Sequence, residues 1–282
     1  AALEKAVDQK MNAVPLKMVG KDVSVYYGEK RALFDVNLDI RETGRARLLL
    51  SGGTTPAPVY ESLAHRPLDW SRVEVGLVDE RWLSPQDQDS NAWLVKQSFL
   101  DHAPAATFIP LVRPGKQLPE CVHTANLQAT HAEPACLAVM GMGGDGHTAS
   151  LFPGSTDLPK ALASPQPYAS LDATGCPGAN QWPLRITLTP AGLAPIPTRL
   201  LLLRGKQKLD VLQAALAGED ISEYPIRVAL QQVAEIAARR ALGRDVEEVE
   251  LTVEEAPARL RRQFAPRAAG HQVIGDDDVG RS

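Results

Sequence analysis

The chain has 282 residues, of which 44% are hydrophobic and 23% charged, and its formal net charge is −4. This length suits one large α/β domain or two small ones, and the acidic balance argues against a general binder of nucleic acids or anionic membranes. No apolar run approaches the about 18 residues of a membrane span, the charged N-terminus lacks the apolar centre of a signal peptide, and the three cysteines do not suggest a disulfide framework. We therefore expect a cytoplasmic globular protein.

Within the atypical N-terminal segment, residues 1–43, the stretch 21–40 alternates apolar and polar residues on either side of Gly28. The alternation predicts two antiparallel strands joined by a turn at that glycine. Residues 17–40, which include "VSVYYGEKRALFDVNLDI", also resemble the opening strands of an ATPase of phosphate-import ABC transporters. The Walker loop that should follow is absent, so we expect no ATP binding here.

Four apolar runs follow in the middle of the chain, and each ends in a polar or glycine-rich stretch. They are "ARLLLSGG", "VEVGLVDER", "CLAVMGMGGDG" and "TRLLLLRGKQK". Continuous apolar runs of this kind are typical of strands buried on both faces of a parallel sheet. Because ligands bind beside the strand-end loops of such sheets, we expect the four polar stretches to converge on one site.

The remaining segments are less regular. Residues 157–197 are rich in proline and suggest a long ordered loop or an insertion. The pattern of residues 230–243 predicts an amphipathic helix, residues 246–255 form an acidic strand candidate, and residues 256–264 a short basic helix. The end of the chain, residues 270–282, has the composition of a disordered tail.

The loop "SGGTTP", residues 51–56, has the features of a phosphate cradle. Its two glycines, Gly52 and Gly53, let backbone N–H groups approach an anion. Thr54 or Thr55 can cap the helix that follows. A tight strand–helix turn without a ligand explains the same residues, so the local pattern leaves both interpretations open.

Three charged residues follow the second strand directly in "VEVGLVDER". Unpaired charges beside a buried strand are costly, so Asp79 and Arg81 are candidate site residues, whereas Glu80 is expected to point away. Residues 89–91, Asp-Ser-Asn, are favoured by composition as ordinary helix-capping residues.

The loop "GMGGDGH" matches the letters of the dinucleotide-binding G-x-G-x-x-G fingerprint. That fingerprint needs an acidic residue at the end of a second strand about 20 residues on, and residues 158–163 ("LPKALA") offer no such strand. His147 instead follows the glycines at a strand end, where an imidazole suits proton transfer near neutrality. A structural histidine is the alternative.

Two further cations, Arg185 in "RITLT" and Lys208 in "RGKQK", lie near other strand ends. Beside a Gly-Thr cradle they would form a phosphate clamp, and otherwise they are solvated surface charges. The sequence has no P-loop, no G-x-S-x-G nucleophile elbow and no H-E-x-x-H motif. We expect no metal site, because the spacing of its cysteines and histidines matches no common zinc site.

Together these motifs resemble the 6-phosphogluconolactonase family. The matching stretches are "SGGTTP", "DERWLSPQDQDSN", "GMGGDGHTASLFPG", "RITLT", "GKQK" and "YPIR", in family order across about residues 44–230. The resemblance implies an α/β fold with a Rossmann-like parallel sheet flanked by helices, similar to the sugar-phosphate isomerases and deaminases. It also implies hydrolysis of 6-phosphoglucono-δ-lactone to 6-phosphogluconate in the oxidative pentose phosphate pathway, without metal or organic cofactor.

The resemblance also suggests roles for individual residues. His147 would move protons during water attack, Asp79 would orient that machinery, and Arg81 would hold the substrate. The expected substrate- and phosphate-binding residues are Gly52, Gly53, Thr54, Thr55, Gly143, Asp145, Arg185 and Lys208. We expect a monomer acting on a small sugar phosphate, without nucleic-acid or membrane partners.

Two alternatives stay open. One is a deaminase or isomerase of amino-sugar phosphates, a related family with a Gly-Thr turn and a "DGH" loop. The other is an inactive sugar-phosphate-binding module, because both ends of the chain depart from the family. Residues 1–43 lack the usual first helix, and no closing strand is recognisable in residues 231–282. We expect the acidic strand candidate to cover the exposed sheet edge next to the lactonase-like domain, residues 44–230.

Overall fold

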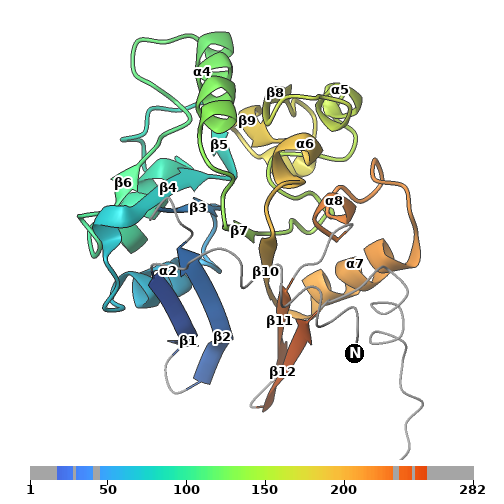
Figure 1. The fold of residues 1–282 in the computed structure, drawn as a ribbon. Coiled ribbons are helices and arrows are strands. Elements are labelled where there is room, and N and C mark those ends of the chain that lie inside the picture. The colour runs from blue at the N-terminus through green and yellow to red at the C-terminus, as the bar shows by residue number, and fades with distance from the viewer. Residues whose placement is uncertain (1–17, 28–29, 41–44, 231–234, 243–244, 253–282) are drawn as a thin grey trace, which may run out of the picture.

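The computed structural model describes residues 18–27, 30–40, 45–230, 235–242 and 245–252, and outside 45–230 it describes the backbone alone. A seven-stranded sheet forms the centre, in the order β12-β11-β10-β7-β3-β4-β6 (Figure 1). Its pairs are parallel except β11–β12. The strands are β3 (Ala46–Leu50), β4 (Val73–Leu77), β6 (Thr107–Phe108), β7 (Leu137–Met140), β10 (Thr198–Arg204), β11 (Glu235–Leu242) and β12 (Asp245–Thr252).

Helices surround this sheet, which confirms the predicted α/β class. α7 (Lys206–Ala217) lies beside β10 and β11, and α2 (Ala57–Ala64) lies beside the strand β1 (Met18–Tyr27) (Figure 1). α2 also packs against η2 (Lys96–Leu100). No helix in the described part of the chain is long and apolar enough to cross a membrane. The α-helices are α2 (Ala57–Ala64), α3 (Asn91–Val95), α4 (Leu118–His131), α5 (Leu158–Leu162), α6 (Pro190–Leu193), α7 (Lys206–Ala217) and α8 (Arg227–Leu230). The short 3-10 helices are η1 (Trp70–Arg72) and η3 (Pro177–Ala179), and η2 (Lys96–Leu100) is a π-helix.

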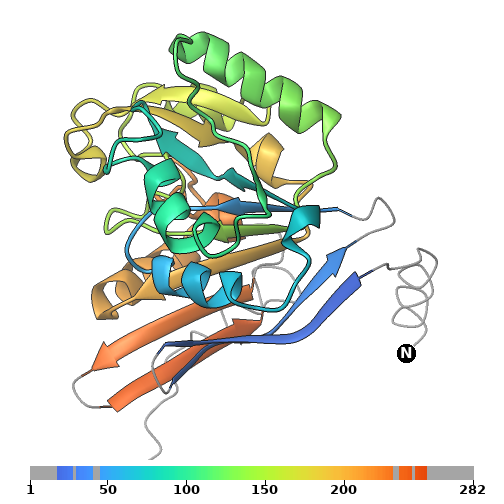
Figure 2. The same cartoon turned by 90° about the vertical axis from the view of Figure 1, so that its left-hand side faces the viewer.

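The four predicted strands all form, and for the expected reason. Every residue of β7 is buried, and β10 is buried from its second to its sixth residue. Such strands have apolar side chains on both faces, which only a sheet covered on both sides can bury. The predicted hairpin also forms, with β1 (Met18–Tyr27) antiparallel to β2 (Lys30–Ile40) in a sheet of its own (Figure 2). The turn at Gly28 lies outside the described residues.

A second, antiparallel sheet corrects two expectations. It has the order β5-β9-β8, with β5 (Asp79–Arg81), β8 (Tyr168–Asp172) and β9 (Leu184–Leu188). Residues 157–197 therefore contain two strands and are not a long loop, and residues 79–81 are a strand rather than a loop. Five-residue strands between prolines have too little periodicity to be recognised locally, and they form because they pair with each other and with β5.

The C-terminal part corrects a further expectation. Residues 235–242, in the middle of the predicted helix 230–243, form the strand β11, which pairs in parallel with β10. The alanines and arginines of "EIAARRAL" favour a helix locally, but the free edge of β10 accepts them as a strand. The strand β11 was not recognisable in the sequence. The acidic segment does form a strand over residues 245–252, as β12, but it pairs with β11 and not with β10. The strand that covers the edge of residues 44–230 is therefore β11, which corrects the expectation that the acidic strand would do so. The predicted basic helix at 256–264 and the tail at 270–282 lie outside the described residues.

Candidate active site

A cavity of about 310 Å³ lies at the ends of the central strands. Residues 51–56 after β3, residues 141–143 after β7, Asp79 and Arg81 of β5, and Lys208 in the first turn of α7 all line it. The predicted convergence of the four polar stretches is therefore confirmed. His147 and the Thr54–Thr55 turn line this same cavity, as a joint site requires.

The glycine-threonine turn is shaped by close approaches. Gly53 has φ +101°, a conformation that side chains rarely adopt, and a Cβ on Gly52 would lie 1.9 Å from the Asn91 Oδ1 atom. The start of the turn is fixed by Tyr60 of α2, whose hydroxyl accepts the Ser51 N–H (3.0 Å) and donates to the Ser51 carbonyl (2.9 Å).

The expectation that a threonine caps α2 is wrong. Pro56 is the residue before the first turn of the helix, and no side-chain hydrogen bond caps it. Thr54 and Thr55 line the cavity instead. Proline fits this position because the N–H groups of a first turn have no partner within the helix.

Asp79 is buried, with 6% of its surface exposed, and it lines the cavity. Its Oδ2 atom accepts a 2.5 Å hydrogen bond from the Ser150 hydroxyl, and its Oδ1 atom accepts one from Asn91 Nδ2 at 3.4 Å. The Ser150 N–H in turn donates to the Thr187 hydroxyl at 3.0 Å. Ser150 thus ties the histidine loop to Asp79 of β5 and to Thr187 of the neighbouring strand β9.

Glu80 points away from the cavity. Its carboxylate accepts the backbone N–H groups of Arg81, Asn91 and Ala92 at 2.7–2.8 Å, so it holds the N-terminus of α3. Burial raises the pKa of Glu80 to about 7, although the three hydrogen bonds act in the opposite direction. The side chain therefore stabilises the elements next to the site.

Residues 89–91 play three different parts. Ser90 caps α3 as predicted, accepting the Trp93 N–H at 2.9 Å. Asn91 reaches the cavity, where its amide donates to the Asp79 carbonyl at 2.8 Å. Asp89 links two walls of the site: its carbonyl accepts a hydrogen bond from Arg81 Nη1, and its carboxylate accepts the indole N–H of Trp182 at 2.9 Å.

His147 is paired with a carboxylate two residues away. Its Nδ1 atom lies 2.6 Å from Asp145 Oδ1, and its backbone N–H donates to the same oxygen at 3.1 Å. The imidazole lies 4.3 Å from the ring of Phe152, centroid to centroid. Burial alone would raise the pKa of Asp145, but the hydrogen bond and the charge of His147 outweigh it, and the pKa is lowered. The pair, called the dyad below, has Nδ1–H as donor to the carboxylate, which leaves the lone pair on Nε2.

Two glycines make room for the dyad. A Cβ on Gly143 would lie 2.2 Å from two atoms of the His147 ring, and one on Gly178 would lie 2.6 Å from Asp145 Oδ2 and 2.9 Å from His147 Nδ1. Gly143 was predicted as a site residue, whereas Gly178 comes from η3 in the segment that the sequence suggested to be a loop. Its only sequence signal is the glycine itself, because its neighbour in space is more than 30 residues away.

The two expected cations differ in their surroundings. Arg185 is buried at 5% exposure, donates to the carbonyls of Trp182 (2.7 Å) and Ala179 (2.9 Å), and lies 5.3 Å from the Phe152 ring centre. Lys208 is half-buried, and its pKa is lowered by burial, with the charge of Asp145 acting against that change. Both line the cavity and are not free surface charges.

Backbone strain is also concentrated here. Among the described residues, Ala149 (φ +49°) and Asn180 (φ +55°) are the non-glycine residues with positive φ, and both line the cavity. Residues held in such conformations cluster at functional sites, because the surrounding structure must impose them. Asn180 was not singled out in the sequence. No group of three or more His, Cys, Asp or Glu residues that could hold a metal ion occurs within the described ranges.

Comparisons with known proteins point to one family. Residues 28–238 match the family model of glucosamine-6-phosphate isomerases/6-phosphogluconolactonase. A 6-phosphogluconolactonase of Xylella fastidiosa is 70% identical over 192 residues, covering 68% of this chain and 80% of that protein, and one of Pseudomonas aeruginosa is 41% identical over 194 residues, covering 68% and 80%.

Solved structures show the same fold. The crystal structure of a 6-phosphogluconolactonase from Shewanella baltica superposes with a TM-score of 0.64 at 32% identity, covering 70% of this chain and 84% of that one. A monomeric glucosamine-6-phosphate deaminase shares the fold at 19% identity with a TM-score of 0.58, covering 71% and 87%. The motifs, the sheet and these matches together show that the chain belongs to the glucosamine-6-phosphate isomerase/6-phosphogluconolactonase family.

Proposed function

We propose that this protein is a 6-phosphogluconolactonase, which hydrolyses 6-phosphoglucono-δ-lactone to 6-phosphogluconate in the pentose phosphate pathway. The relative at 70% identity carries that activity in its name. The observation that carries the proposal is that the histidine of a histidine–carboxylate dyad lines the same cavity as a glycine-threonine turn. The first suits acid–base chemistry, and the second suits a phosphate.

In the proposed reaction, His147 is the general base. Its Nε2 atom takes a proton from water while the water oxygen bonds to the lactone carbonyl carbon, whose C=O electrons move onto oxygen. When this intermediate collapses, the bond from that carbon to the ring oxygen breaks and the imidazolium returns the proton to the ring oxygen. The Asp145 carboxylate, 2.6 Å from Nδ1, orients the ring and stabilises its charged form.

This assignment changes two expected roles. Asp145 was expected among the substrate-binding residues, and Asp79 was expected to orient the histidine. Because the Asp145 carboxylate contacts the imidazole and would repel a phosphate, we assign the orienting role to Asp145. Asp79, bonded to Ser150 and Asn91, supports the loop that carries the dyad.

The phosphate anchor is proposed at residues 52–55, with Arg185 and Lys208 as cations and Arg81 holding the rest of the substrate. Gly143 keeps the wall beside the imidazole free. The lining holds three cations and one carboxylate, that of Asp79, while the Asp145 carboxylate contacts the lining residue His147. Even with Asp145 counted, one positive charge is in excess, which favours a phosphorylated ligand. Asn91 lines the same cavity as a neutral hydrogen-bonding group.

The catalytic demand is modest. A δ-lactone is an activated ester, so general-base catalysis contributing a factor of about 10²–10⁴, together with positioning, is sufficient without a covalent nucleophile. This agrees with a sequence that lacks a nucleophile elbow.

The test is acid release from freshly prepared 6-phosphogluconolactone, corrected for spontaneous opening. We expect turnover by the full chain and loss of turnover with retained ligand binding for His147→Ala. Ammonia release from glucosamine 6-phosphate would favour the deaminase alternative. Binding of the sugar phosphate without any turnover by the unmodified chain would favour the inactive module.

We further propose that residues 44–230 carry the catalytic machinery, that residues 1–43 and 231–282 are additions to it, and that the protein is a cytoplasmic monomer without cofactor, nucleic-acid partner or membrane partner. Gel filtration with light scattering tests the monomer, and a dimer mass would contradict it.

A further inference from the structure

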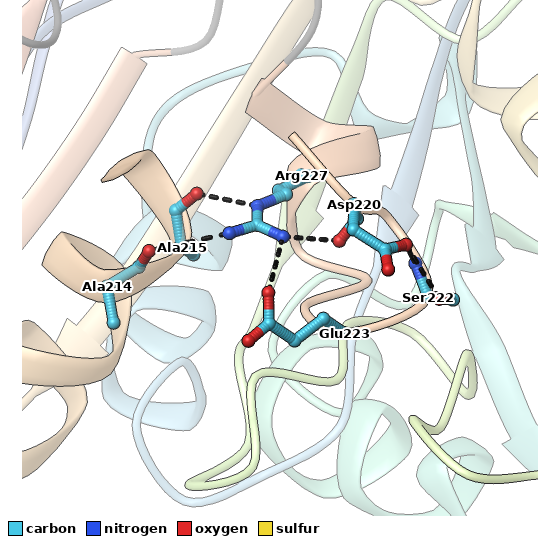
Figure 3. A network of polar contacts seen from close by, with 6 residues as sticks. All are labelled: Ala214, Ala215, Asp220, Ser222, Glu223 and Arg227. Carbon is cyan, nitrogen blue, oxygen red and sulfur yellow. Dashed lines mark hydrogen bonds and ion pairs between the residues drawn. The ribbon is translucent and has the colours of Figure 1, made fainter. Parts of the chain in front are cut away.

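Arg227, in the "YPIR" stretch, is a buried cation outside the cavity. Only 6% of its side chain is exposed. Figure 3 shows its bonds: Nε donates to the Ala215 carbonyl at 2.6 Å, Nη2 to the Ala214 carbonyl at 3.4 Å, and Nη1 to the Asp220 carbonyl and to Glu223 Oε2 at 3.2 Å. One guanidinium thus holds the last turn of α7 and the segment that follows it.

Charge pairing does not explain this burial. Three of the four acceptors are backbone carbonyls, and the carboxylate belongs to Glu223, whose side chain is 60% exposed and contributes little as an ion-pair partner. The chain even keeps space for the guanidinium: a Cβ on Gly218 would lie 2.5 Å from Nη2. The planar fork of Arg227 is used to fix backbone geometry.

The fixed segment packs on the loop of the dyad. The guanidinium carbon of Arg227 lies 4.9 Å from the centre of the Tyr224 ring, and a Cβ on Gly146 would lie 2.5 Å from Tyr224 Cδ1. The Ile226 N–H donates to the Gly146 carbonyl at 2.9 Å. Gly146 has φ +80° and separates Asp145 from His147 in the sequence. A shift of the Tyr224–Ile226 segment therefore acts on the peptide between the two members of the dyad.

We propose that Arg227 is a positioning residue for the reaction, because it holds residues 224–226 against Gly146 and thereby fixes the distance between Asp145 and the His147 ring. The same guanidinium anchors the C-terminal turn of α7, whose first turn carries Lys208. The inference rests on the proposed lactonase function for its kinetic readout, and a second readout is independent of turnover.

The kinetic test compares Arg227→Met and Arg227→Lys with Glu223→Gln, which removes only the charge of the exposed partner. We expect kcat to fall on the order of 10-fold for Arg227→Met, with KM changed by less than about twofold, because displaced catalytic groups lower kcat. Arg227→Lys keeps the charge but not the planar fork, so its kcat should lie between those of Arg227→Met and the unmodified protein. Glu223→Gln should have the kcat of the unmodified protein. Tyr224→Leu should lower kcat similarly, and the Arg227→Met/Tyr224→Leu double variant should not fall further, because both changes act on one contact.

The independent readout is the proton NMR signal of the His147 Nδ1–H group, assigned by its absence in His147→Gln. A short hydrogen bond to a carboxylate gives a strongly downfield signal, which we expect to weaken or vanish in Arg227→Met. An unchanged signal and unchanged kcat with only a lower melting temperature would show a merely stabilising role and overturn the proposal. Should Arg227→Met not fold, the same criteria apply to Arg227→Lys. If the unmodified protein releases no acid and Arg227→Met still loses the NMR signal, the lactonase function is refuted. The positioning role of Arg227 is then supported all the same.

Discussion

The contact between Gly178 and the dyad gives the most direct test of the proposed site. In Gly178→Ala, the new Cβ would lie 2.6 Å from Asp145 Oδ2, 2.9 Å from His147 Nδ1 and 3.1 Å from His147 Cε1. Ordinary contact begins at 3.4 Å, so the groups must separate by 3.4 − 2.6 = 0.8 Å at the closest pair. Gly178 does not have a positive φ, so alanine adds crowding without backbone strain.

The dyad is the part that must move. The segment around Gly178 is held by Arg185, which donates to the carbonyls of Ala179 and Trp182, and by the indole of Trp182, which donates to Asp89. Since a misplacement of about 1 Å can cost on the order of 100-fold in rate, a shift of up to 0.8 Å should lower kcat by about 10- to 100-fold.

The assay is acid release under saturating lactone, with the melting temperature followed by circular dichroism. Gly144→Ala is the matched control, because it lies in the dyad loop, has no positive φ and would place its Cβ in open space. It should keep kcat within about twofold, since no group must move. A Gly178→Ala protein that folds and turns over like Gly144→Ala would refute the close contact and, with it, the assignment of the dyad to the reaction.

Four further predictions follow from the same geometry. Asp145→Asn should lower kcat by about 10²–10³ with little change in KM, measured by acid release, because the amide cannot stabilise an imidazolium; an unchanged kcat would return the orienting role to another group. Lys208→Met should raise KM on the order of 10-fold with a smaller change in kcat, and the opposite split would place Lys208 in the chemical step. Burial raises the pKa of Glu80 from its ordinary 4.5 to about 7. Between these two pH values the folded protein holds a proton that the unfolded chain releases, so the free energy of unfolding falls as the pH rises from 4.5 to 7. Urea titrations at pH 4.5 and pH 7 measure how much the free energy of unfolding changes between the two pH values. Glu80→Gln should make this change smaller by up to about 3 kcal/mol, and the same change in both proteins would contradict the buried, proton-holding state of Glu80. Ending the chain after Leu230 removes β11 and β12 and exposes the edge of β10, so the truncated protein should aggregate in light scattering and lose turnover; unchanged solubility and turnover would show that the strands are dispensable.

The convergence of the site was determined by local sequence. The apolar runs of β3, β7 and β10 are hydrophobic enough to require burial on both faces, so they predict parallel strands. Once these strands are parallel, their following loops must meet at one edge of the sheet, and this brings Thr54 and His147 to one cavity.

The details of the site depended on residues distant in the sequence. Asp79 pairs with Thr187 across two antiparallel strands, and this pairing, invisible to any local pattern, brings β8 and β9 to the site. The partner of His147 was two residues away, but a carboxylate beside a histidine in sequence does not by itself predict their contact. The positions of Gly143 and Gly178 against the ring show that the loop geometry decided it.

The sequence by itself determined the class of the fold and the residues that meet where the central strands end. It could do so because the burial of a strand and the direction of the chain follow from each segment alone. Only the tertiary structure decided that residues 235–242 extend the sheet instead of forming a helix, and that Asp145 rather than Asp79 contacts the imidazole. A strand at a sheet edge and a side chain in a tight loop take their conformation from the neighbours they meet, and those neighbours are fixed only when the whole chain has folded.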